Sequence, residues 1–114
     1  LTLENIGNVN ATLYLKTGKN STQFIGGSDP AYQFNISNNE TGSCWQNNNT
    51  GNFTTIGLYY EVNATNGDGT KVCDYFSYED SKDALRIDIL LRVPSSSNTG
   101  TIEDTITATA YTAS

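Results

Sequence analysis

Hydrophobic and polar residues alternate with a period of two along most of this chain, which is the pattern of β-strands that bury one face. The clearest run spans residues 84–94, where charged residues occupy one face except at Leu90, and Pro94 ends the run. The apolar residues on the other face are Leu85, Ile87, Ile89, Leu91 and Val93. This run predicts a strand with five side chains turned toward a core.

Shorter runs with the same period predict further strands, and segments rich in Gly and Asn separate them as turns. No window has a helical period, although residues 79–85 have room for one short turn. The expected strands lie within residues 1–5, 9–17, 31–37, 57–65, 70–78, 84–94 and 101–110. We therefore expect an all-β fold of seven to nine strands, a single antiparallel β-sandwich of the jelly-roll or Ig-like type, with residues 1–114 as one domain.

The composition of the chain disfavours two kinds of partner, nucleic acids and the interior of a membrane. The 114 residues carry a net charge of −6, which disfavours binding to the phosphate backbone of nucleic acids. No apolar run reaches the eighteen or so residues that a membrane-spanning helix needs, so we expect no membrane span in this chain. The first residue is Leu1 and not Met, which we interpret as a processed mature form or an excised domain.

The residues needed for catalysis are sparse. The chain has no histidine, so a serine or cysteine nucleophile has no imidazole base and a metal site has no imidazole ligand. The acidic residues Asp74, Glu79, Asp80 and Asp83 cluster in sequence, but their spacing is not that of an EF-hand loop. A solvated acidic face explains them better than calcium. We expect no enzyme activity, no cofactor and no metal.

The two cysteines, Cys44 and Cys73, have two interpretations. They would form a disulfide in an oxidising compartment and would stay free, buried thiols in a cytosolic protein. The glycosylation signals described next favour the oxidising compartment. We therefore predict the disulfide Cys44–Cys73.

Asn-x-Ser/Thr triplets, the acceptor signal for N-glycosylation, are about twice as frequent as random placement of the same residues would give. They begin at Asn10, Asn20, Asn35, Asn39, Asn48, Asn52 and Asn63. Asn also favours turns for conformational reasons, so the count alone does not prove modification. We predict a secreted, extracellular glycoprotein in which some of the seven carry covalent N-glycans.

The aromatic residues have two interpretations, as core packing or as a sugar-binding surface. Trp45 follows Cys44 directly, and an indole packed beside a disulfide is common in β-sandwich cores, so we expect Trp45 to be buried. If Trp45 and some tyrosines were exposed instead, they would suit stacking against sugars. The alternative function is therefore a carbohydrate-binding or adhesin module.

Two stretches of the sequence resemble segments of known extracellular proteins. "LTLENIGNVNATLYL" at residues 1–15 resembles the opening of extracellular β-domains of prokaryotic surface proteins, and "LRVPSSSNTGTIEDTITATA" at residues 91–110 resembles their closing strands. With the acidic charge and the glycosylation signals, the chain is similar to archaeal extracellular filament or pilus subunits. These include bundling pilins related to the biofilm-matrix protein TasA and thread-like filaments. The hydrophobic N-terminal helix of type IV pilins and archaellins is not present, which disfavours those classes unless that helix has been removed.

The resemblance implies a structural subunit of an extracellular filament or surface layer, which supports adhesion or biofilm. Subunits of such families assemble by donor-strand complementation, in which one copy completes the sheet of the next. The candidate intersubunit strands are the two terminal segments. The residues that share one face of each segment are Leu1, Leu3 and Asn5 at one end, and Ile102, Ile106, Ala108 and Ala110 at the other. The alternative is that both segments pair only within their own domain.

Overall fold

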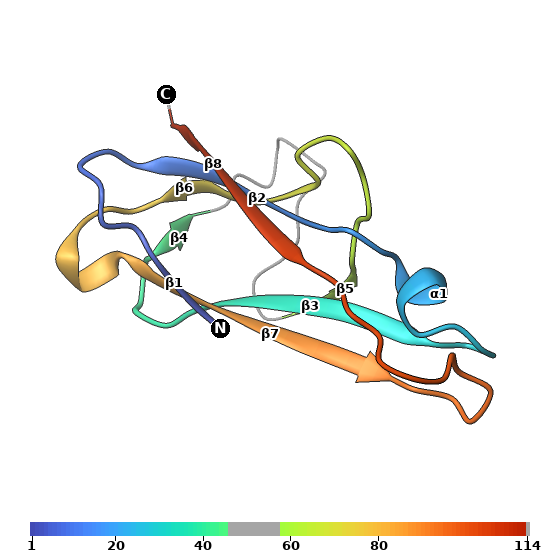
Figure 1. Cartoon of the computed structure of the whole chain (residues 1–114). Helices are drawn as coiled ribbons and strands as arrows, with labels where there is room; N and C mark the ends of the chain where they lie inside the picture. Colours follow the sequence, from blue (N-terminus) through green and yellow to red (C-terminus); the bar gives the residue numbers. More distant parts are fainter. Residues whose placement is uncertain (46–57, 114) are drawn as a thin grey trace.

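A computed structural model describes residues 1–45 and 58–113 of the chain. Two four-stranded antiparallel sheets pack face to face, which confirms the all-β sandwich (Figure 1). The elements are β1 (Thr2–Glu4), β2 (Ala11–Thr17), α1 (Ser21–Phe24), β3 (Ala31–Asn38), β4 (Cys44–Trp45), β5 (Tyr59–Glu61), β6 (Thr70–Phe76), the short 3₁₀ turn η1 (Asp80–Lys82), β7 (Ala84–Arg92) and β8 (Ile106–Thr112).

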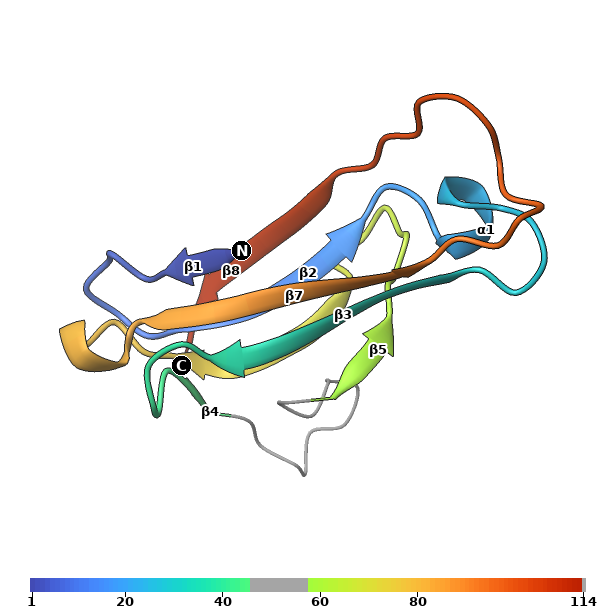
Figure 2. The ribbon, with the colours of Figure 1, turned by 90° about the horizontal axis from the view of Figure 1, so that it is seen from below.

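The strand order brings distant parts of the sequence together. The first sheet has the order β1-β7-β3-β5, and the second has the order β4-β6-β2-β8. In Figure 1 the first sheet forms the lower layer and the second sheet the upper layer. The two terminal strands, β1 and β8, therefore lie at the edges of different sheets on the same side of the sandwich (Figure 2).

The core lies between the two sheets and is built from residues that alternate along their strands. Leu15 of β2, Ile36 of β3, Val72 of β6 and Leu85 of β7 are fully buried there. The inward faces predicted for β2, β3 and the first half of β7 are confirmed by this burial. Burying side chains of this size supplies most of the favourable free energy of folding.

The predicted burial of the second half of β7 is wrong. Ile89, Leu91 and Val93 continue the face of Leu85 and Ile87, yet they are 36, 49 and 59% exposed. β7 runs on beyond the end of β1 (Figure 2), and the exposed fractions show that the opposite sheet covers this half of the strand only partly. Alternation determines which way a side chain points, but not whether anything lies opposite it.

Two short elements were not predicted from the sequence. The helix α1 is a single turn that begins with a capping box, in which Asn20 and Gln23 each bond the other's backbone N–H. Four residues are too few to show a helical period. The strand β4 has only two residues and owes its place to Cys44, which is bonded to β6.

The segment before β8 is tied to the first sheet by Tyr32 on β3. The Tyr32 hydroxyl donates a hydrogen bond of 2.8 Å to Oδ2 of Asp104. Burial of the ring, together with the Asp104 carboxylate, raises the pKa of the Tyr32 hydroxyl above its usual value. The hydroxyl thus stays a donor, and the bond holds the start of β8 over the sandwich.

Candidate functional site

The outer edge of β7 is the first candidate surface. The amino group of Leu1 donates to the carbonyl oxygen of Ile87 at 3.0 Å, and the Ile87 N–H donates to the Leu1 carbonyl at 2.7 Å. Bonded pairs alternate along an antiparallel ladder, so Ile89 and Leu91 direct their backbone N–H and C=O groups to the same outer side. Within residues 1–45 and 58–113, no strand pairs with β7 on that side beyond Ile87. We call residues Asp88–Arg92 the open β7 edge.

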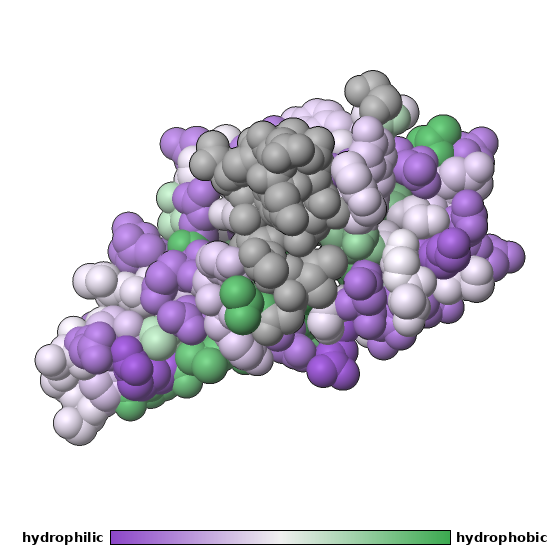
Figure 3. Space-filling view, turned by 180° about the vertical axis from the view of Figure 1, so that it is seen from behind, coloured by the Kyte–Doolittle hydropathy of each residue, from purple (hydrophilic) through white to green (hydrophobic). Residues whose placement is uncertain are grey.

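The open β7 edge is also apolar. Ile89, Leu90 and Leu91 are each at least 36% exposed, which is unusual for three consecutive aliphatic residues in a strand. Seen from behind, the molecular surface is largely hydrophilic, and hydrophobic surface runs along its lower margin toward the end where β7 terminates (Figure 3). An unpaired, apolar strand edge of this kind is suited to accept another strand.

A groove of about 300 Å³ lies between the terminal strands. Leu3 and Asn5 line one wall, Ala108 and Ala110 line the other, and Leu13 lies at its base. The structure therefore brings together four of the predicted intersubunit residues, taken from opposite ends of the chain. The walls are mostly small or apolar side chains, which leaves room for an inserted extended segment.

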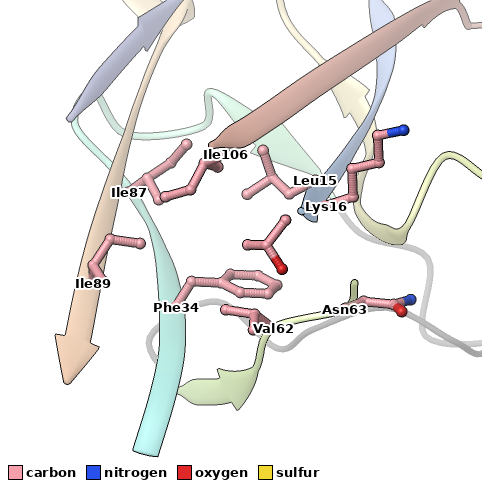
Figure 4. Close-up of a pocket in the computed structure, with 9 residues that line it drawn as sticks. Leu15, Lys16, Phe34, Val62, Asn63, Ile87, Ile89 and Ile106 are labelled. Carbon is pink, nitrogen blue, oxygen red and sulfur yellow. The ribbon is translucent and has the colours of Figure 1, made fainter. Parts of the chain in front are cut away.

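The remaining predicted intersubunit residues lie elsewhere. Leu1 is exposed at the start of β1, and Ile102 is half-buried in the loop before β8. Ile106 faces Ile87 and Ile89 across a closed interior pocket of about 10 Å³ (Figure 4). That pocket is lined mainly by aliphatic and aromatic side chains and is too small for a ligand, so it belongs to the core.

Both terminal strands pair within their own chain here. β1 makes three residue pairs with β7, whereas β8 makes seven with β2. A strand donated to the open β7 edge would lie beyond the register that β1 occupies, so it would not compete with the acceptor's own β1. The smaller pairing of β1 makes it the easier of the two to detach.

The disulfide joins Cys44 to Cys73 and so pins β4 to β6. The expected burial of Trp45 beside it is wrong, since the Trp45 side chain is 51% exposed. Successive residues of a strand point to opposite faces, and Cys44 occupies the inward position. Trp45 is therefore forced outward, where its ring packs against Tyr75 with centroids 5.0 Å apart.

A row of aromatic side chains crosses the outer face of the second sheet. Trp45 pairs with Tyr75, and on the next two strands Thr12 pairs with Tyr111. The Thr12 hydroxyl donates to the carbonyl of Asp74, which places Thr12 beside Tyr75. We call Trp45, Tyr75 and Tyr111 the aromatic row. The exposed fractions of these side chains show that they point outward, and only the strand order reveals that they are neighbours.

The predicted glycosylation sites have different surroundings. Asn10, Asn20, Asn39 and Asn63 are exposed. Asn35 is half-buried on β3, and its Oδ1 atom is buried without a hydrogen-bond partner. Asn48 and Asn52 lie outside the described residues.

The acidic residues predicted as a solvated face have different surroundings in the fold. Asp74 forms an ion pair with Lys71 at 3.0 Å, Glu79 lies 4.0 Å from Lys82, and Asp83 is buried. The part of the chain that the structure describes contains no group of three His, Cys, Asp or Glu side chains placed to hold a metal ion. Nor does any helix in that part have the length and apolar character needed to cross a bilayer.

The fold and its surfaces thus define a disulfide-bonded antiparallel β-sandwich with an open strand edge. Comparisons with protein-family models, with curated proteins and with solved structures find no match for this chain. The likeness to filament subunits therefore depends on the sequence stretches alone.

Proposed function

We propose that this protein is a structural subunit of an extracellular filament or surface layer, in which copies join by donor-strand complementation and support adhesion or biofilm. The observation that carries the proposal is the open β7 edge, where no other strand of residues 1–45 and 58–113 pairs on the outer side and where Ile89 and Leu91 are exposed. A strand added there gains backbone hydrogen bonds, and its alternate side chains cover the exposed aliphatic residues.

The donor that we favour is β1 of a neighbouring copy. It is held by few pairs, and Leu1 at its start is 73% exposed. Each copy would donate its β1 to one neighbour and accept the β1 of another. The two surfaces in such a contact differ, so the contact is heterologous, and heterologous contacts form fibres when they do not close into rings.

Blocking the open β7 edge should stop assembly. Leu91→Lys places a charge among the side chains that an added strand would cover, and a lysine on a strand edge opposes edge pairing. Because Leu91 is 49% exposed, the fold should lose little stability. We expect the native protein to form filaments in negative-stain electron microscopy and this variant to remain dispersed.

Val9→Lys is the matched control, since Val9 is 47% exposed but lies in the loop before β2 and not on β7. Filaments should persist in that variant. A native protein that stays monomeric and dispersed at all concentrations would refute the filament proposal. Equal loss of filaments in both variants would show that added charge, and not the edge, is responsible.

The extracellular location is part of the proposal and is supported by the disulfide and by the four exposed glycosylation signals. Mass spectrometry of protein from its native source should show peptides bearing glycans, with Asn10, Asn20, Asn39 or Asn63 among the modified sites. We expect Asn35 to be unmodified, because its side chain is partly buried in the sheet. Native protein with the mass of the bare chain would contradict the prediction.

The exposure of Trp45 favours a second candidate function, that of a carbohydrate-binding or adhesin module. An indole at the surface contributes no core packing, yet it offers a large rigid face to a ligand. The two functions are compatible, since many surface structures both assemble and adhere.

A further inference from the structure

We propose that the aromatic row on the outer face of the second sheet is a binding site for uncharged glycans. Trp45, Tyr75 and Tyr111 are 51, 38 and 50% exposed and come from β4, β6 and β8. Rings held on a flat sheet present apolar faces, against which the C–H faces of sugar rings stack. The open β7 edge belongs to the other sheet, so this site does not depend on the filament proposal.

The spacing of the rings suits an extended chain of sugars and not a single one. Tyr75 and Tyr111 lie on strands separated by β2, and neighbouring strands are about 4.8 Å apart, so their positions differ by roughly 10 Å. Trp45 extends the row by one more strand beside Tyr75. The row therefore crosses the full width of the sheet, and several consecutive sugar units are needed to cover it.

The rings are held in place before any ligand binds. The Tyr111 hydroxyl donates to both carboxylate oxygens of Asp68, at 3.0 and 2.9 Å, and its ring meets Tyr14 edge to face. This hydrogen bond also raises the pKa of Tyr111. Trp45 is fixed by contact with Tyr75 and by the disulfide at the preceding residue. Ordering these side chains in advance reduces the entropy lost on binding.

The charges around the row favour an uncharged ligand. Lys71 and Asp74 neutralise each other in an ion pair, and Asp68 is engaged by Tyr111. The net charge of −6 further repels anionic polymers. The sugar hydroxyls find partners nearby, because the same face continues into a polar depression of about 360 Å³ lined by Lys16, Thr107 and others.

The chain supplies its own reporter, because Trp45 is its single tryptophan. The probes are hexasaccharides of β-1,4-linked glucose, β-1,4-linked N-acetylglucosamine and α-linked mannose, each titrated to about 1 mM, where even weak binding is detected. We expect at least one probe to change the intensity or the emission maximum of Trp45 fluorescence in a saturable way. The corresponding monosaccharides should have far less effect.

Variants locate the site while keeping the reporter. Tyr75→Ala and Tyr111→Ala should each weaken binding of that probe about tenfold, because each removes one stacking surface. Tyr59→Ala and Tyr78→Ala are matched controls, since these residues are 42 and 41% exposed but lie outside the aromatic row. Both controls should bind as the native chain does, and so should Leu91→Lys.

Several outcomes would overturn the proposal. Absence of any saturable change with all three probes is one, and equal weakening in the control variants is another. Isothermal titration calorimetry on the same proteins checks that the signal reports binding, and circular dichroism checks that each variant is folded. Failure of glycan binding would leave the filament proposal intact, because that proposal is tested at Leu91.

Discussion

Replacing Leu85 by alanine should lower the free energy of unfolding by about 3 kcal/mol, because the side chain is fully buried between the sheets. Leu85 lies where β7 is paired on both sides, opposite Leu3 of β1 and Asn38 of β3. Truncation there removes packing contacts and leaves a cavity that paired strands cannot readily close. Urea denaturation followed by circular dichroism measures the loss.

Leu91→Ala is the matched control on the same strand. Its side chain is on the face of Leu85 but is 49% exposed, so the loss should be below about 1 kcal/mol. The comparison is made on dilute protein, so that assembly cannot cover the strand edge. Equal losses at the two positions would contradict the exposed position of the second half of β7.

Removing the disulfide should have a similarly large effect. The variant Cys44→Ala/Cys73→Ala opens a loop with a sequence separation of 29, and the gain in entropy of the unfolded chain corresponds to about 3.5 kcal/mol. For a domain of this size, that loss lowers the melting temperature by roughly 15 °C. Differential scanning calorimetry provides the measurement.

Reduction offers an independent check on the disulfide. A reducing agent should lower the melting temperature of the native chain toward that of the double variant and leave the variant unchanged. Apart from the disulfide, β4 is held by two residue pairs with β6, by the contact of Trp45 with Tyr75 and by a 2.8 Å hydrogen bond from the Cys44 N–H to Asn38 Oδ1. A native chain whose melting is insensitive to reductant would contradict a stabilising role for this bond.

The aromatic row shows why a site can escape sequence reasoning. The residues of the row, and Thr12 between them, lie about thirty residues or more apart along the chain: Thr12, Trp45, Tyr75 and Tyr111. They meet only because the second sheet has the order β4-β6-β2-β8. No local pattern records which strands become neighbours. The outward direction of Trp45 and Tyr75 and the order of the strands both come from the tertiary structure, so the row could not be predicted from the sequence.

The sequence by itself determined the all-β class, the approximate positions of the longer strands and the inward faces of residues such as Leu85 and Ile87. These follow from local rules, since the pleat of a strand sends successive side chains to opposite faces whatever the rest of the chain does. The tertiary structure alone decided that Leu91 is exposed and that Trp45 points outward. Burial depends on what lies across from a face, and that is set by pairing between residues far apart in the chain.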